Sequence, residues 1–290
     1  MTKKIAEMNR ILMQKMSVFL NYEPTFVQKS MVGELCRDCG LCEKEAFSHI
    51  LAAVIGLDTE HDTLEREIFT SYFPRMLHHL KAEEFANNPY LCEISFSSKV
   101  SGAWELLPMN YRACEAFACD DLREFSDGAV IPQIGFFTED FFYPAVRERG
   151  RIWMTVTPNE IRTMQKPIAR AHGSVLTYGL GLGYFAFMAA RKSNVDSVTV
   201  VERDQNAIAL FEEVLRPQMS CAHKIKVVQA DAFDYAVHTM YKEGFDFVFA
   251  DIWHDASDGV DAYLRLKATE ALSPHTEFMY WIEDTLRFYL

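Results

Sequence analysis

The sequence lacks a long uninterrupted apolar run. Its longest nearly apolar stretch, residues 175–190, contains three glycines and a threonine and falls short of the ~20 residues that a membrane-spanning helix needs. The opening residues, MTKKIAEMNR, are charged and lack the apolar segment of a secretory signal. We therefore expect a soluble, cytoplasmic protein with no membrane partner.

Basic residues are also scarce. Lysine and arginine total 29 against 41 acidic residues, which gives a formal net charge of −12. Because phosphate backbones repel an acidic chain, we expect no nucleic-acid partner. The stretch ELCRDCGLCEKEAFSHIL resembles a helix-turn-helix around Gly40, but Asp38, Glu43 and Glu45 crowd the face that would read DNA. This segment therefore predicts a helical hairpin rather than a DNA reader.

Cysteines are few and odd in number. Seven cysteines in a chain without an export signal indicate reduced thiols rather than a disulfide framework. Cys36, Cys39 and Cys42 form a C-x-x-C-x-x-C run, and His49 is the nearest candidate for a fourth zinc ligand. Structural zinc sites pair two separated C-x-x-C knuckles, so we expect packed thiols here and no metal.

The texture of the chain changes twice, which divides it into three segments. Residues 1–100 read as a helical N-terminal region, in which KIAEMNRILMQKMSVFL carries apolar residues at helical spacing. Residues 101–156 read as a small β segment and connector, with strands interrupted at Pro108, Gly128 and Pro132 and with an aromatic-rich loop, FFTEDFFYPAVRERGRIW. We interpret its aromatic side chains either as core or as a lid over a planar substrate.

The third segment, residues 157–290, has a regular rhythm. It opens on TVTPNEI, in which Thr157 and Glu160 fit a capping box around Pro158. Short apolar runs then alternate with helical segments, which predicts βαβ units, a parallel sheet and a doubly wound α/β domain with strand order 3-2-1-4-5. The predicted strands are Val175–Tyr178, Val198–Val201, Ile225–Val228, Phe245–Ala250 and Phe278–Ile282.

The first of these strands runs into a glycine-rich turn. In VLTYGLGLGYF the glycines are Gly179, Gly181 and Gly183, and a turn of this kind between a strand and a helix lets a ligand approach the backbone. Without a ligand, the same glycines would serve close packing of the helix on the strand. Glu202 ends the next strand, where a carboxylate can accept hydrogen bonds from both ribose hydroxyls, and Asp204 is placed to cap the following helix.

Acidic residues also follow the next two strands. Asp231 lies just past the third strand, in QADAF, and Asp251 ends the fourth, in FADIWHD. Ligands of doubly wound sheets bind outside the carboxyl ends of the strands, so we expect these carboxylates to converge on one crevice. Asp231 can also cap the helix that starts at Ala232.

These motifs together resemble class I S-adenosylmethionine-dependent methyltransferases, over about residues 157–290. The resemblance implies a Rossmann-like fold, S-adenosylmethionine as cofactor, and methyl transfer to a small-molecule acceptor. It implies that the glycine loop holds the methionine part and that Asp251 faces the reacting centre. The implied cofactor-binding residues are Gly179, Gly181, Gly183, Glu202 for the ribose, and Asp231 with the backbone of Ala232 and Phe233 for the adenine.

The run DIWHD resembles the D-H-W-K-D run of catechol-type O-methyltransferases. By that resemblance the catalytic candidates are Asp251, His254 and Asp255, and His254 stands where that group has a lysine base; a histidine is also a general base near neutral pH. Glu283 and Asp284 lie where that group has further Mg²⁺ ligands. A solvated acidic rim is the simpler interpretation, and we expect no metal.

Two departures keep other functions open. The cadence of the chain is similar to the spermidine synthase-like branch, but Leu182 stands where aminopropyl transferases carry an aspartate, and Thr177 where methyltransferases often carry an acidic residue. Gly181, Gly183 and Ala186 also fit the G-x-G-x-x-A pattern of an NAD-dependent oxidoreductase. Because the chain ends just after the fifth strand, a non-catalytic cofactor-binding protein is the remaining alternative.

Overall fold

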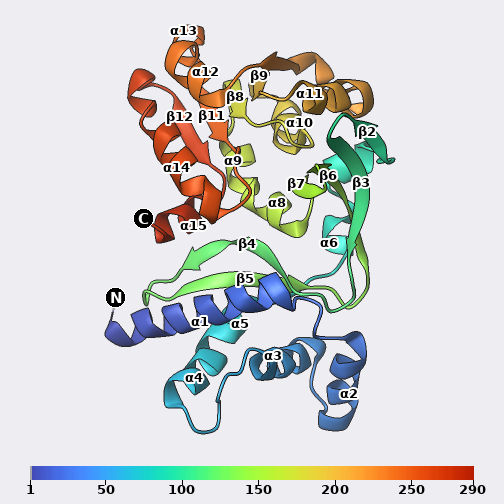
Figure 1. Ribbon diagram of the computed structural model, residues 1–290, viewed down its shortest axis with the longest axis vertical. Coiled ribbons are helices and arrows are strands. Elements are labelled where there is room, and N and C mark those ends of the chain that lie inside the picture. Colours follow the sequence, from blue (N-terminus) through green and yellow to red (C-terminus); the bar gives the residue numbers. More distant parts are fainter. Residues whose placement is uncertain (1) are drawn as a thin grey trace. The chain divides into compact units, whose positions relative to one another are not determined.

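The computed structural model describes residues 2–290, which form two compact units (Figure 1). Unit 1 combines the N-terminal residues through 85 with residues 110–142, and unit 2 combines residues 86–109 with residues 143–290. These units differ from the sequence segments 1–100, 101–156 and 157–290, which follow changes in local pattern. No described helix is both long enough and apolar enough to span a bilayer.

The helices of unit 1 follow the predicted pattern. Helix α1 (Lys3–Tyr22) buries one stripe of side chains that includes Leu12 and Phe19. Helix α2 (Lys29–Cys39) ends at Gly40, whose φ of 68° gives the left-handed cap that glycine favours. Helix α3 (Glu43–Val54) follows directly, so the predicted helical hairpin is confirmed. The remaining helical elements are α4 (Thr63–Glu67), the π-helical turn η1 (Ile68–Tyr72), α5 (Phe73–Met76) and α6 (Glu83–Ala86).

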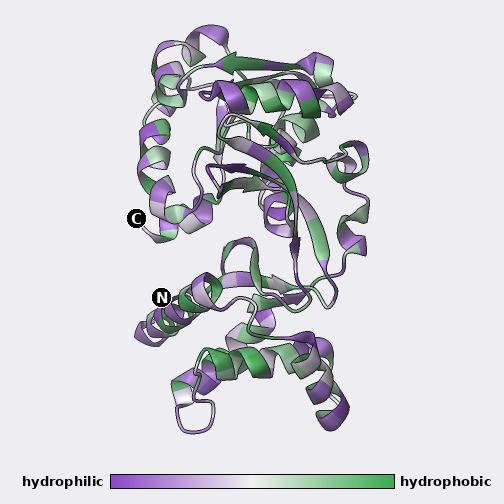
Figure 2. Cartoon of the chain, turned by 45° about the vertical axis from the view of Figure 1, so that its right-hand side comes forward, coloured by the Kyte–Doolittle hydropathy of each residue, from purple (hydrophilic) through white to green (hydrophobic). Residues whose placement is uncertain are grey.

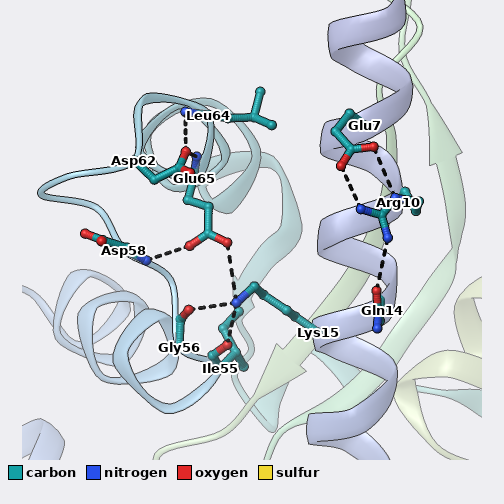
Figure 3. Close-up of polar contacts among 10 residues, drawn as sticks. All are labelled: Glu7, Arg10, Gln14, Lys15, Ile55, Gly56, Asp58, Asp62, Leu64 and Glu65. Atoms are coloured by element: carbon teal, nitrogen blue, oxygen red, sulfur yellow. Dashed lines mark hydrogen bonds and ion pairs between the residues drawn. The ribbon is translucent and has the colours of Figure 1, made fainter.

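A single lysine fastens α1 to the turn after α3 (Figure 3). The ammonium of Lys15 donates to the carbonyl oxygens of Gly56 at 2.7 Å and Ile55 at 3.2 Å, and it lies 3.5 Å from Glu65. Glu65 in turn accepts from the backbone N–H of Asp58 at 2.6 Å. The exposed carbonyls at the C-terminus of α3 thus receive a cation, which is the charge that this end of a helix favours.

Unit 1 contains a three-stranded sheet with order β1-β5-β4. Strand β5 (Val130–Phe136) pairs in parallel with β1 (Leu77–His79) and antiparallel with β4 (Phe117–Glu124). The expected break at Pro132 is wrong, because this proline lies inside β5. Strand β1 was not predicted, since three residues carry too little pattern to stand out beside a helix.

Unit 2 holds most of a second, four-stranded sheet. Its order is β2-β3-β6-β7, from β2 (Lys99–Ser101), β3 (Trp104–Tyr111), β6 (Phe141–Glu148) and β7 (Arg151–Thr155). The prediction that FFTEDFFYPAVRERGRIW is a loop is wrong, because most of it forms the antiparallel pair β6–β7. Pro108, likewise expected to break a strand, lies within β3.

The predicted parallel sheet is present in unit 2, and its order β10-β9-β8-β11-β12 is the predicted 3-2-1-4-5. All four neighbouring pairs are parallel. Figure 1 shows helices on both sides of this sheet, and Figure 2 shows hydrophobic residues along its strands. The strands are β8 (Gly173–Tyr178), β9 (Val195–Glu202), β10 (Ile225–Gln229), β11 (Phe247–Ala250) and β12 (Glu277–Tyr280). Unit 2 is therefore a doubly wound α/β fold.

The helices of unit 2 begin where the sequence indicates. Asp204 caps α11 (Gln205–Leu210) by accepting from the N–H groups of Asn206 and Ala207, as predicted.

The other helices of unit 2 are α7 (Pro89–Glu93), α8 (Pro158–Thr163), α9 (Gln165–Arg170), α10 (Tyr184–Ala190), α12 (Ala232–His238), α13 (Met240–Glu243), α14 (Ala256–Lys267) and α15 (Glu283–Phe288). Shorter π and 3-10 turns are η2 (Phe211–Leu215), η3 (Arg216–Gln218), η4 (Ala222–Lys224) and η5 (Glu270–Leu272).

The strand register aligns the carboxyl ends of the central strands. Tyr178, the last residue of β8, pairs with Val201 of β9 and with Ala250 of β11. The residues that come next, Gly179 and Asp251, therefore leave the sheet at one level, beside Glu202. This alignment is what brings the predicted site residues to one edge.

Candidate active site

The glycine turn at the end of β8 is conformationally demanding. Gly179, Gly181 and Gly183 have φ angles of 97°, 50° and 71°, in the left-handed region that side chains with a Cβ rarely adopt. Gly183 occupies the N-cap position of α10. The turn thus needs glycine for its backbone shape alone, before any ligand is considered.

Protein atoms already approach all three glycines closely. A Cβ on Gly179 would lie 2.0 Å from the carbonyl oxygen of Asp251, and one on Gly181 would lie 2.0 Å from the sulfur of Met154. At Gly183 the neighbour is Phe211, at 2.5 Å. These close neighbours come from the segment after β11, from β7 and from η2, so packing within the protein also requires small residues here. Gly179 and Gly181 in addition line cavities.

Met154, from β7, covers the turn. Its sulfur accepts a hydrogen bond from the backbone N–H of Leu182 at 3.2 Å and occupies the space above Gly181. A thioether is a weak acceptor, so this hydrogen bond satisfies the loop N–H without binding it strongly. A ligand with a stronger acceptor could replace it.

Glu202 ends β9 with its carboxylate turned into the protein. It is only 8% exposed, and it accepts from the backbone N–H groups of Leu180 at 3.2 Å and Asp204 at 2.9 Å. Burial raises the pKa of Glu202, although these backbone hydrogen bonds oppose the shift. The carboxylate is thus held rigidly by the glycine turn on one side and by the start of α11 on the other.

A cavity of about 130 Å³ lies beside Glu202. Asp231 faces it and also caps α12, accepting from the N–H groups of Phe233 and Asp234 through the same oxygen, Oδ1. Both roles expected of Asp231 are therefore compatible. The predicted cofactor-binding residues that line this cavity are Gly179, Glu202, Asp231, Ala232 and Phe233. Its other lining residues include Trp153, Arg203, Asp251 and Ile252. We call it the nucleoside cavity because of its carboxylate and flat hydrophobic walls.

A second cavity, of about 50 Å³, adjoins the first. The two share Trp153, Gly179 and Asp251 in their walls. Other walls of the second cavity are Glu160, Thr177, Gly181, Trp253, His254 and Trp281. We call it the carboxylate cavity, because Glu160 and Asp251 both border it. Of the predicted glycines, Gly183 lines neither cavity.

Glu160 and Asp251 form a pair of carboxyl groups in this cavity. Burial raises the pKa of Asp251 to about 7, and burial together with the charge of Asp251 raises the pKa of Glu160 well above its usual range. The predicted capping box is wrong: the Thr157 side chain makes no capping hydrogen bond to α8. The sequence motif predicted a capping role for Glu160, whereas the structure places its side chain at the carboxylate cavity.

His254 presents one ring nitrogen to the carboxylate cavity. Its Nδ1 lies 2.7 Å from Oδ2 of Asp258, and its backbone N–H donates to Oδ1 of the same residue at 3.0 Å. Burial raises the pKa of Asp258, but the hydrogen bonds from His254 and Asp255 outweigh it and the pKa is lowered. The ionised carboxylate only accepts, so Nδ1 carries a proton; in the neutral imidazole, Nε2 then has the lone pair of a base.

The Nε2 atom of His254 is buried and has no hydrogen-bond partner among the described residues, and the same holds for Nε1 of Trp253. The indole edge of Trp153 fixes the imidazole, with ring centroids 4.1 Å apart. Unpaired buried polar atoms are rare and costly. Both residues border the carboxylate cavity, and each retains one unused hydrogen-bonding atom.

Two predicted site residues lie elsewhere. Asp255 is exposed and caps α14, where it accepts from the N–H and hydroxyl of Ser257, and it does not border either cavity. Glu283 and Asp284 were expected at the end of the fifth strand, but they begin α15 instead. Its carboxylate accepts from Tyr263 at 2.8 Å and Arg287 at 2.7 Å.

Metal ligands do not converge in this structure. Across residues 2–290 no three side chains of histidine, cysteine, aspartate or glutamate are grouped to hold an ion. Cys39 and Cys42 are exposed and Cys36 is partly buried, so the expectation that this run packs its thiols is wrong for two of the three.

Comparisons with known proteins give distant structural similarities only. No protein-family model matches this chain, and no curated protein does. A "putative O-methyltransferase" from Klebsiella pneumoniae is 20% identical over 34% of this chain and 43% of its own, with a TM-score of 0.26. A "putative SAM-dependent methyltransferase" from Streptococcus mutans is 18% identical over 44% of this chain and 36% of its own, with a TM-score of 0.32. The chain thus matches less than half of either protein, and similarity at this level assigns neither family nor function.

Proposed function

We propose that this protein binds S-adenosylmethionine and transfers its methyl group to a small molecule. The observation that carries the proposal is the acidic lining of two adjoining cavities at the carboxyl edge of a doubly wound sheet. Glu160, Glu202 and Asp251 border them, and Arg203 is the single lysine or arginine among the lining residues. A buried site of this sign favours a cationic ligand.

S-adenosylmethionine matches both parts of this site. Its nucleoside would occupy the nucleoside cavity, with the ribose hydroxyls on Glu202 and the adenine beside Asp231, Ala232 and Phe233. Its sulfonium and ammonium groups carry the positive charge that the carboxylate cavity favours. NAD, by contrast, would place a pyrophosphate among these carboxylates, where like charges repel.

Methyl transfer asks little of the protein beyond alignment. The sulfonium supplies a methyl group on a good leaving group; holding the acceptor in line with it can contribute on the order of 7–11 kcal/mol. The part of the protein would be to take the proton that the acceptor loses on methylation, and Nε2 of His254 would be its acceptor. Asp258 holds the imidazole in the tautomer that this transfer requires.

This arrangement favours an acceptor that carries a removable proton, such as a hydroxyl group on a planar molecule. The indoles of Trp153, Trp253 and Trp281 border the carboxylate cavity and provide flat apolar walls. Aminopropyl transfer, the activity of the similar spermidine synthase-like branch, would use the same two cavities with the decarboxylated cofactor. The unpaired base at His254 is the feature that favours methyl transfer to a protic acceptor.

Thermal unfolding with a panel of ligands tests the cofactor. We expect S-adenosylmethionine and S-adenosylhomocysteine to raise the Tm, by an amount that corresponds to about 2.7 kcal/mol at 100 times Kd. Methylthioadenosine should raise it less, NADH not at all, and Mg²⁺ should change nothing. A shift with NADH alone would replace the proposal with an oxidoreductase. No shift with any ligand would leave a fold without this activity.

A further inference from the structure

The Glu160 side chain is a buried acid without a protein partner. It is 8% exposed, and within residues 2–290 no side chain or N–H group forms a hydrogen bond or ion pair with its carboxyl group. It borders the carboxylate cavity together with Asp251 and the buried hydroxyl side chain of Thr177. An isolated buried carboxylate is strongly disfavoured. Burial and the charge of Asp251 raise the pKa of Glu160, so its carboxyl group keeps a proton until a cationic group compensates the negative charge.

Three kinds of group could compensate this charge. Lysine and arginine are absent from the described residues that line this cavity, and its one imidazole, that of His254, is paired with Asp258. A metal site built from three or more histidine, cysteine, aspartate or glutamate side chains does not occur among the described residues. The third kind is a cationic group on the ligand itself, which can reach Glu160 because the cavity adjoins the nucleoside cavity.

The order of the two cavities identifies that cationic group. A ligand whose ribose lies on Glu202 would pass two of the three residues shared by both cavities, Gly179 and Asp251, before it reaches Glu160. In S-adenosylmethionine the end opposite the nucleoside carries an α-ammonium group. We propose that Glu160 binds this ammonium and thereby selects nucleosides that carry an amino-acid or amine extension. This inference rests on the proposed function and adds a specificity-determining residue to it.

The buried position of Glu160 makes the expected selectivity strong. A charge-assisted hydrogen bond in a poorly solvated cavity is worth more than one at the surface. Trp281 and Met164 also border this end of the cavity, and they shield the pair from water. A neutral extension would leave the carboxyl group unpaired, so the protein should discriminate between nucleosides that differ only in their amino group.

Three ligands with one nucleoside test the inference. They are S-adenosylhomocysteine, its analogue without the α-amino group, and methylthioadenosine, which lacks the whole amino-acid part. Titration calorimetry at pH 8 gives the Kd of each for the natural protein, for Glu160→Gln and for Glu277→Gln. The control residue Glu277 pairs with Arg170 at the surface and borders neither cavity.

We expect the natural protein and Glu277→Gln to bind S-adenosylhomocysteine at least tenfold more tightly than the deaminated analogue. Glu160→Gln should lose most of this preference and keep the affinity for methylthioadenosine. The inference is overturned if the natural protein does not discriminate, an outcome that needs no variant to fold, or if Glu160→Gln weakens all three ligands equally. If the natural protein binds none of the three, the proposed function itself fails.

Discussion

The two units of this molecule differ in how completely their buried polar groups are hydrogen-bonded. In unit 1, the buried side chain of Asn9 is fully used: its amide oxygen accepts from the Tyr72 hydroxyl at 3.0 Å and from the backbone N–H of Val130 at 3.1 Å, and its amide nitrogen donates to Gly128. Gln133 is likewise paired, with Ile131 and His78. These groups hold elements together and leave no bonding capacity for a ligand.

In unit 2, three buried side-chain nitrogen atoms are recorded without a partner among the described residues; Trp104 Nε1 lies apart, and the other two belong to neighbouring residues that border one cavity. His254 Nε2 and Trp253 Nε1 are buried without partners among the described residues, and Glu160 and Asp251 share a cavity with them. Because unpaired buried groups cost stability, their accumulation at the carboxyl edge of one sheet points to binding rather than folding. The contrast teaches that hydrogen-bond satisfaction distinguishes a structural polar core from a candidate site.

The largest effect should come from His254→Ala. Removing the base should lower methyl transfer by a factor of about 10²–10⁴, measured with labelled S-adenosylmethionine and an acceptor identified from a panel of planar hydroxylated compounds. Asp255→Ala is the matched control, because it removes a neighbouring helix cap outside both cavities. It should cost about 1 kcal/mol of stability and leave transfer unchanged. Equal loss of transfer in both variants would contradict the assignment of the base.

Gly181→Val should abolish ligand binding, with a loss of at least about 100-fold in affinity, equivalent to about 2.7 kcal/mol. Its Cβ would meet Met154, and the turn would lose its shape. Gly244→Val is the control, since Gly244 also has a positive φ of 68° but has no neighbour within 4 Å. Both variants should show similar backbone strain in thermal unfolding. If Gly181→Val binds S-adenosylhomocysteine normally, the glycine turn has no part in the site.

Asn9→Ala tests the other side of the comparison. It leaves the Tyr72 hydroxyl and the Val130 N–H buried without their acceptor, so we expect a loss of about 1–3 kcal/mol in the free energy of unfolding, measured by urea denaturation. The affinity of folded protein for S-adenosylhomocysteine should not change. A loss of affinity with intact stability would show that unit 1 also serves the site.

The smallest effect concerns pH. Because the pKa of Asp251 is raised to about 7, the folded protein binds more protons than the unfolded chain between about pH 4 and pH 7, so its contribution to stability falls as pH rises through that range. Asp251→Asn should reduce the loss of stability between pH 5 and pH 8 by about 1 kcal/mol, a value discounted because Asp251 is only partly buried.

The control for that measurement lies in unit 1. A hydrogen bond from the Ala129 N–H lowers the pKa of Asp127, so this carboxylate titrates below the tested range. Asp127→Asn should therefore leave the stability difference between pH 5 and pH 8 unchanged. Urea denaturation at the two pH values decides both cases, and an unaltered pH dependence in Asp251→Asn would mean that its carboxyl group is ordinary.

The parallel sheet could be read from the sequence because its signals are local and repeated. Each strand is a short apolar run such as Val198–Val201, and alternation with helices restricts the order of the strands to few choices. The pair β6–β7 was missed because its aromatic residues, charged residues and Pro144 do not alternate regularly. Its pairing is decided by contacts with other strands, which no local pattern reports.

The site was predicted in part for the same reason. Residues that directly follow strands, such as Glu202 and Asp251, were found because strand ends can be located in the sequence. Glu160 and Asp258 were missed, since their roles depend on which way a helix faces. One signal was present for Asp258: it follows His254 by four residues, the spacing at which two side chains meet at the start of a helix. The only sequence signal at Glu160 was a capping-box pattern, which predicted the wrong role.

The position of Met154 has a consequence for the association rate and the heat-capacity change of ligand binding. A cavity of about 50 Å³ holds about three water molecules, which is less room than an amino-acid chain needs, so we expect the Met154 thioether to move away from Gly181 and the Leu182 N–H when such a ligand binds. Binding is then an exchange of one sulfur-containing chain for another. The heat-capacity change should be smaller than the area of the ligand suggests, and the association rate should be set by the motion of Met154. In the proposed complex, the methionine part of the ligand would take the place that the Met154 side chain has in this structure.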